Sequence, residues 1–118
     1  MDPARGGRSL GLSELRAALA SSDPAVRARA IPRVREEPGV QDALIEALRD
    51  ASADVRRAAV RTLARLQGSG ATRALIHVST NDLSVAVRAE AVAALGRILE
   101  TRTMRDGGPE GSRRNSTR

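Results

Sequence analysis

Residues 50–66, DASADVRRAAVRTLARL, form a segment that occurs in two further copies along the chain. One copy is DLSVAVRAEAVAALGRIL at residues 82–99, and the other is SSDPAVRARAIPRV, which begins at residue 21. Aligned on Val26, Val55 and Val87, the copies repeat small and aliphatic residues at offsets 0, 4, 5 and 8, which are typical of one face of a helix. The intervals of 29 and 32 residues between these valines predict a stack of similar helical units.

The pattern predicts an all-α protein, a short α-solenoid of about three helical hairpins. We expect the units at about residues 9–37, 38–67 and 69–103, which together form one domain of residues 9–103. Residues 1–8 are predicted to be a flexible tail, and residues 104–118 a disordered tail rich in Arg, Gly and Ser.

Local signals indicate where helices begin and end. Asp23 followed by Pro24 is typical of a helix start, because Asp caps free amides and Pro fits the first helical position. Pro32 lies eight residues further on and predicts that this helix kinks or ends early. The other expected helix caps are Ser9 or Ser13, Ser52 and Ser84.

The composition excludes several functions. The 118 residues include no aromatic residue and no cysteine, so the core must consist of Ala, Val, Leu and Ile, and neither a disulfide framework nor a thiolate metal site is available. No apolar run reaches transmembrane length, and the first residues lack the apolar core of a signal peptide. A soluble, cytoplasmic protein without membrane contact, cofactor or metal is expected.

The net charge of +6 lies mainly in the expected tails. Residues 10–100 contain 13 Arg and 11 acidic residues, or +2, whereas residues 1–9 contribute +1 and residues 101–118 contribute +3. All 20 basic residues are Arg, which raises the isoelectric point because guanidinium groups stay charged.

The segments ALIEALRDASADVRRAAVRTLARL and SVAVRAEAVAALGRIL carry a resemblance to a known family. Over about residues 10–100 the chain resembles HEAT-like repeats of the type named after phycobilisome lyases. Their units read roughly as Leu-Leu-x-x-Leu, an Asp-containing turn, Val-Arg, then Ala-x-x-Ala-Leu-Gly-x-Leu. The resemblance implies a helical-hairpin solenoid, but such repeats serve as scaffolds, inhibitors, lyase subunits and DNA-repair enzymes, so it implies no single function.

The same resemblance implies a structural role for arginines that follow the turns. In HEAT-like repeats the turn Asp and the Arg six positions later tend to form a ladder that links neighbouring units. Asp50 with Arg56 and Asp82 with Arg88 have this spacing, whereas Ser21 takes the Asp position before Arg27 and leaves the ladder incomplete in the first unit. We therefore exclude these arginines from any nucleic-acid patch.

The candidate functional surface is a row of arginines opposite the core. If Val55 and Ala59 face the core, a rotation of about 100° per residue places Arg57, Arg61 and Arg65 on the other side of that helix. In a stacked array the second helices line the concave face, where such folds usually bind. The neighbouring helices would add Arg29, Arg33 and Arg97, while Glu90 and Glu100 dilute the charge.

These arginines leave two interpretations open besides that of a merely solvated face. The first is a non-catalytic adaptor or scaffold that binds a partner protein, with an acidic segment as its ligand. The alternative is weak nucleic-acid binding through the Arg-rich groove and tails, which the nearly neutral core and the lack of stacking aromatics disfavour. An accessory role in a lyase-type enzyme rests on the resemblance alone.

Catalysis is not expected, because the only histidine, His77, aligns with Glu46 on the exposed side of a helix and has no accompanying catalytic motif. Both end helices keep apolar residues, which favours a homo-oligomer or a docked partner. These residues are Leu10, Leu12 and Leu15 at the first end and Val92, Leu95, Ile98 and Leu99 at the second.

Overall fold

The computed structural model describes residues 8–105, which form six α-helices and one short 3-10 helix. In chain order these are α2 (Leu12–Leu19), α3 (Pro24–Ala30), the 3-10 helix η1 (Ile31–Arg33), α4 (Val40–Ala47), α5 (Ala53–Leu66), α6 (Ala71–Asn81) and α7 (Val85–Arg105). Helix α7 thus continues two residues past the expected domain boundary. The expected tails otherwise fall on residues 1–7 and 106–118, outside the described part.

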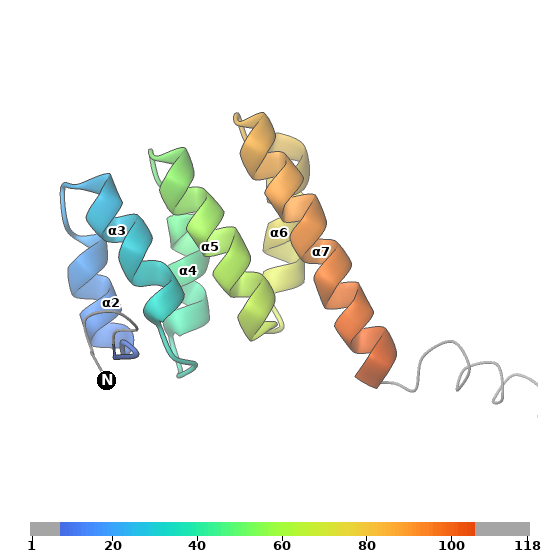
Figure 1. Ribbon diagram of the computed structural model, residues 1–118, viewed down its shortest axis with the longest axis horizontal. Coiled ribbons are helices and arrows are strands. Elements are labelled where there is room, and N and C mark those ends of the chain that lie inside the picture. The colour runs from blue at the N-terminus through green and yellow to red at the C-terminus, as the bar shows by residue number, and fades with distance from the viewer. Residues whose placement is uncertain (1–7, 106–118) are drawn as a thin grey trace, which may run out of the picture.

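The helices form three hairpins that stand side by side in a row (Figure 1). Helices α3, α5 and α7 form one layer, and α2, α4 and α6 form the layer behind it (Figure 1). Helix α5 packs against α3 on one side and α7 on the other. The predicted all-α fold, a short α-solenoid, is therefore confirmed.

The two proline signals act as expected on α3. The Asp23 carboxylate accepts a hydrogen bond of 2.9 Å from the backbone N–H of Ala25, which caps the helix with Pro24 in its first turn. At Pro32 the α-helix has already ended, and the chain continues as η1. The early end predicted from Pro32 is confirmed.

The expected cap of the first helix is wrong. Neither Ser9 nor Ser13 caps α2, which begins after Gly11, whose N–H donates to Glu14 Oε1 at 2.8 Å. The residues before Gly11 are engaged elsewhere, because the N–H of Leu10 donates to the carbonyl of Arg33 at 2.8 Å. Glu14 is a local signal for this start, whereas the contact of Leu10 with Arg33 joins distant segments and has no local signal in the sequence.

One apolar core runs through all three hairpins. The alignment valines Val55 and Val87 are fully buried, and so are Ala59 and Ala91 one helical turn later. Val26 of the first unit is only partly buried. The offsets read from the sequence therefore mark the inner face of α5 and α7 most clearly.

A left-handed glycine fixes the connection between the first and second units. Gly39 has φ +91° at the start of α4, a conformation that residues with a side chain rarely adopt. A Cβ atom at this position would also lie 2.6 Å from Leu12 Cδ2. The glycine thus lets α4 start close against α2.

Candidate functional site

Two arginine–aspartate pairs join successive units. Arg27 donates from Nε to Asp50 Oδ2 at 2.8 Å and from Nη2 to Oδ1 at 2.9 Å. Arg56 makes the same pair of bonds with Asp82, at 2.8 and 3.0 Å. We call these two pairs the ladder; each arginine belongs to one unit and its aspartate to the next, so Arg27 takes part although its own turn carries Ser21.

Each ladder arginine also bonds to its own turn. Nη1 donates to the carbonyl six residues earlier, from Arg27 to Ser21 at 2.9 Å and from Arg56 to Asp50 at 2.8 Å. The third arginine of the series, Arg88, donates in the same way to the carbonyl of Asp82 at 2.6 Å. The arginines therefore hold the turns in shape as well as the units together.

The two aspartates are stabilised in their charged form. Asp50 and Asp82 each accept a further hydrogen bond, from the backbone N–H of Ser52 and Ser84, at 2.9 Å. The bonds from Arg27 lower the pKa of Asp50 despite partial burial. At Asp82 burial acts to raise the pKa, but the bonds from Arg56 and Ser84 and the arginine charges together lower it.

Two arginines of the predicted row on α5 form ion pairs with a glutamate of α7. Glu90 Oε1 lies 3.1 Å from Arg61 Nη2 and 3.7 Å from Arg57 Nη2, and Glu90 Oε2 lies 3.7 Å from Arg97 Nη2. The hydrogen bond from Arg61 holds the pKa of Glu90 below its usual value, and the same bond raises the pKa of Arg61. Glu90 therefore accepts a hydrogen bond from Arg61 and forms ion pairs with all three arginines.

The other predicted arginines have different surroundings. Arg65 donates from Nη2 to the carbonyls of Pro32 and Val34, at 3.2 and 3.3 Å, and so connects α5 to the first unit. Arg29 is exposed and occupies in α3 the repeat position that Glu90 occupies in α7. Arg33 is exposed in η1 and reaches the carbonyl of Arg8 at 3.3 Å.

Arg57 differs from its neighbours in the row. Its side chain is 38% exposed, less than that of Arg61 or Arg97. Its Nε is buried and has no hydrogen-bond acceptor within the described residues. An unsatisfied buried donor is unfavourable, so this guanidinium group gains if it can turn toward another acceptor.

We define the basic face as six arginines of α3, η1, α5 and α7 that take no part in the ladder series, together with Glu90. Its arginines are Arg29, Arg33, Arg57, Arg61, Arg65 and Arg97. Arg61 and Arg97 keep more than half of their side chains exposed, at 57% and 52%. The sequence indicated the arginines but only a general dilution of charge by Glu90, because the contact depends on how closely α7 packs on α5.

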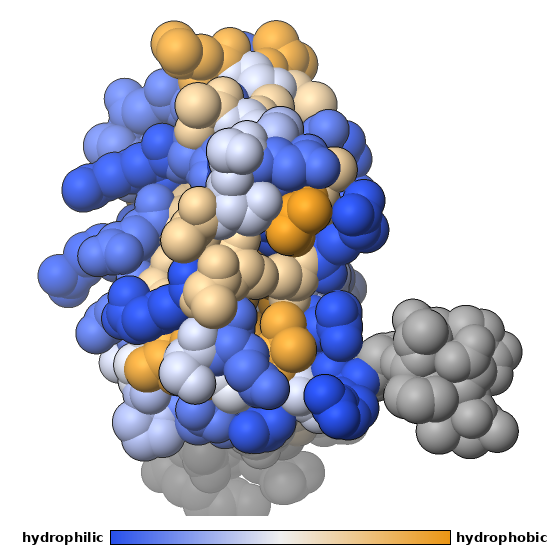
Figure 2. Space-filling view, turned by 90° about the vertical axis from the view of Figure 1, so that its left-hand side faces the viewer, coloured by the Kyte–Doolittle hydropathy of each residue, from blue (hydrophilic) through white to orange (hydrophobic). Residues whose placement is uncertain are grey.

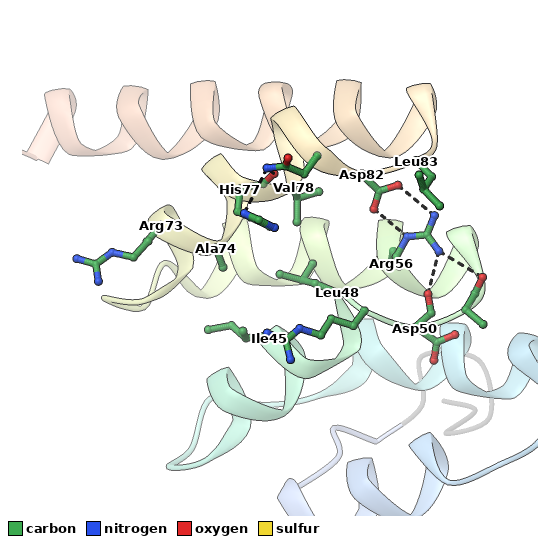
Figure 3. Close-up of a pocket in the computed structure, with 13 residues that line it drawn as sticks. Ile45, Leu48, Asp50, Arg56, Arg73, Ala74, His77, Val78, Asp82 and Leu83 are labelled. Carbon is green, nitrogen blue, oxygen red and sulfur yellow. Dashed lines mark hydrogen bonds and ion pairs between the residues drawn. The ribbon is translucent and has the colours of Figure 1, made fainter.

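A hollow that the sequence did not predict lies between α4 and α6 and has a volume of about 630 Å³. Figure 3 shows Arg73 at one end and the Arg56–Asp82 pair at the other. The apolar side chains between them are Ile45, Leu48, Ala74 and Val78. His77 lines the same hollow and is exposed, 3.3 Å from the amide of Asn81.

The described residues 8–105 contain neither a cluster of potential metal ligands nor a helix long and apolar enough to span a membrane. Arginine–aspartate pairs between stacked helical hairpins define this chain as a helical-repeat protein. Residues 40–106, more than half of the chain, match the HEAT repeats family. The chain belongs to that family.

HEAT repeats generally mediate protein–protein interactions and are usually non-catalytic. The family membership confirms the HEAT-like repeats expected from the sequence, whereas the phycobilisome-lyase subtype stays a resemblance. No curated protein and no solved structure matches the chain.

Proposed function

We propose that this protein is a non-catalytic adaptor or scaffold that binds an acidic segment of a partner protein on its basic face. The observation that supports this best is the charge of that face, which has six arginines and Glu90, a carboxylate that contacts only three of them. A carboxylate-rich segment complements this charge, and complementary charge favours fast and selective association.

The contacts with Glu90 support the proposal in a second way. Arginine side chains lose conformational entropy when a partner immobilises them, which weakens binding. Glu90 already restrains Arg57, Arg61 and Arg97 while leaving the last two more than half exposed. An incoming carboxylate would thus meet guanidinium groups that are partly ordered, and a small movement of Arg57 would satisfy its Nε.

The test uses the full chain and a double charge reversal, Arg61→Glu with Arg97→Glu. These two side chains are the most suitable, because Arg65 bonds to backbone carbonyls and its loss would disturb the fold. Arg73→Glu on α6 is the matched control, since Arg73 is also exposed but lies outside the basic face. Binding of a labelled Glu/Asp-rich peptide and of a 20-base-pair DNA duplex is measured over a salt series.

We expect the double reversal to weaken peptide binding by at least roughly tenfold, because like charges brought together are strongly unfavourable. The control should bind as the unmodified chain does. Duplex binding at micromolar concentration that falls steeply with salt, without peptide binding, would instead support the nucleic-acid alternative. Equal peptide binding by all three proteins would show that the basic face is not the binding surface.

A further inference from the structure

The large apolar side chains that remain exposed among the described residues all lie in the last unit. They are Ile76, Leu83, Val85, Val92, Leu99 and Met104. At the first end Leu15 is fully buried, while Leu10 and Leu12 are partly covered, so the expectation of two apolar ends is wrong there. Figure 2 looks onto this first end and shows a band of weakly hydrophobic residues down the middle with single strongly hydrophobic ones beside it, while strongly hydrophobic residues gather only at the top of the view.

The repeat alignment shows why the last unit differs. Ile31, Val60 and Val92 occupy the same repeat position, and the first two are fully buried whereas Val92 is 59% exposed. Ala64 is buried, but a Cβ atom built on Gly96, its counterpart, would have no neighbour within 4 Å. Helix α7 therefore presents the surface that earlier units cover with their successor, and no described element lies beyond it (Figure 1).

The ladder ends at the same place. Arg27 and Arg56 each bind an aspartate of the following unit through two hydrogen bonds. Arg88, the third arginine of the series, keeps its bond to the carbonyl of Asp82, but within residues 8–105 no carboxylate forms an ion pair with it. The guanidinium group of Arg88 thus lies at the same end of the stack as the uncovered apolar surface, and it has no carboxylate partner within residues 8–105.

We propose that the outward surface of α7 docks a helical hairpin of another protein whose turn carries an aspartate or glutamate. The apolar side chains of the hairpin would cover Val92, Gly96 and Leu99, as α7 itself covers α5. Its carboxylate would accept two hydrogen bonds from Arg88, as Asp82 does from Arg56. This surface is separate from the basic face and does not depend on its function.

A second copy of this chain is a poorer occupant. Stacked head to tail, it would bring its own first unit to α7, and that unit has Ser21 where the other units have Asp50 and Asp82. Arg88 would then meet no carboxylate at the ladder position. Among the described residues, the first end also has no large exposed apolar side chain that could cover Val92.

The experiment extends the full chain, after Arg118, with a second copy of residues 38–67, a hairpin that carries the ladder aspartate. Four residues, Gln67–Gly70, suffice to join α5 to α6, and the added hairpin is separated from α7 by more residues than that. A tether also makes docking intramolecular and raises the effective concentration of the hairpin. Hydrogen exchange of the α7 amides around Val92 is compared with that of the unextended chain.

We expect the added hairpin to slow this exchange by about tenfold or more, because the ladder pair joins charged groups and such hydrogen bonds are strong. Arg88→Ala in α7, or Asp50→Asn in the added copy only, should remove most of this protection. The second variant leaves the original three units unchanged, so a loss of protection in it cannot come from misfolding of these units. Arg73→Ala is the matched control and should keep the protection.

Protection that is absent, or that survives both Arg88→Ala and Asp50→Asn, would overturn the proposal. Sedimentation of the unextended chain tests the other occupant. Self-association at micromolar concentration that Val92→Arg abolishes and Arg88→Ala leaves unchanged would show that a second copy covers α7. A monomer in the same range agrees with docking of another protein.

Discussion

The repeat alignment provides a matched pair of substitutions, Val60→Ala and Val92→Ala. Both valines lie inside helices at the same repeat position, so the change in helix propensity is common to both and cancels in the comparison. Val60 is fully buried, whereas Val92 is 59% exposed. The two variants therefore differ mainly in how much apolar surface each removes from the core.

The structure sets the expected magnitudes. Removing two buried carbon atoms at Val60 costs about 1.6 kcal/mol in lost burial, and the cavity left behind raises the total loss to about 2–3 kcal/mol. At Val92 less than half of the side chain is covered and no enclosed cavity forms, so we expect a loss of about 0.5 kcal/mol or less. The free energy of unfolding is measured by urea denaturation, followed by circular dichroism at 222 nm.

A loss at Val92 equal to that at Val60 would refute the reasoning, because it would mean that α7 is covered in the isolated chain. Measurements at two protein concentrations separate the causes. If the loss at Val92 grows with concentration, a second copy covers it, since the stability of an oligomer depends on concentration.

Three further predictions concern contacts within the fold. Arg56→Ala should lower the free energy of unfolding by about 2–4 kcal/mol, since it leaves the carboxylate of Asp82, whose side chain is 6% exposed, without its partner, whereas Arg73→Ala should change it by less than about 0.5 kcal/mol in the same urea assay. Asp82 and Asp50 have lowered pKa values in the folded protein, so their stabilising contribution is present above about pH 4 and is lost as the pH falls through the folded-state values. Urea midpoints measured from pH 7 to pH 2 should therefore decline mainly below about pH 4. A variant with both aspartates changed to asparagine should show a shallower decline. Gly39→Ala should destabilise the chain by at least about 1 kcal/mol through the left-handed backbone and the clash with Leu12, and a fall in the thermal midpoint of several degrees would show it.

The sequence was most informative where one residue type recurs at one repeat position. The offsets from Val55 and Val87 predicted the inner faces of α5 and α7, because a helix turns by a fixed angle per residue whatever lies around it. The early end of α3 followed equally directly from the geometry of Pro32. Such features depend on local stereochemistry and can be predicted from the sequence alone.

Features that depend on neighbouring elements were not predictable in this way. Val60 and Val92 occupy the same repeat position. Val60 is buried because a further unit follows its own, and Val92 is exposed because no described unit follows α7. Glu90 looked like a diluting charge, but the packing of α7 on α5 brings it to Arg57 and Arg61 at once. Repeat periodicity predicts which face of a helix a residue lies on, but it does not predict which side chains of neighbouring helices meet.

The two proposed surfaces can be occupied together. Arg97 of the basic face and Val92 of the outward surface are five residues apart on α7, which corresponds to a rotation of about 140° around the helix. The two surfaces therefore lie on different sides of α7, and no side chain is assigned to both. Arg61→Glu with Arg97→Glu should leave hairpin docking intact, and Arg88→Ala should leave binding of the acidic peptide intact. Loss of both activities in either variant would mean that the substitution had disturbed the fold, whereas loss of one alone assigns it to its surface.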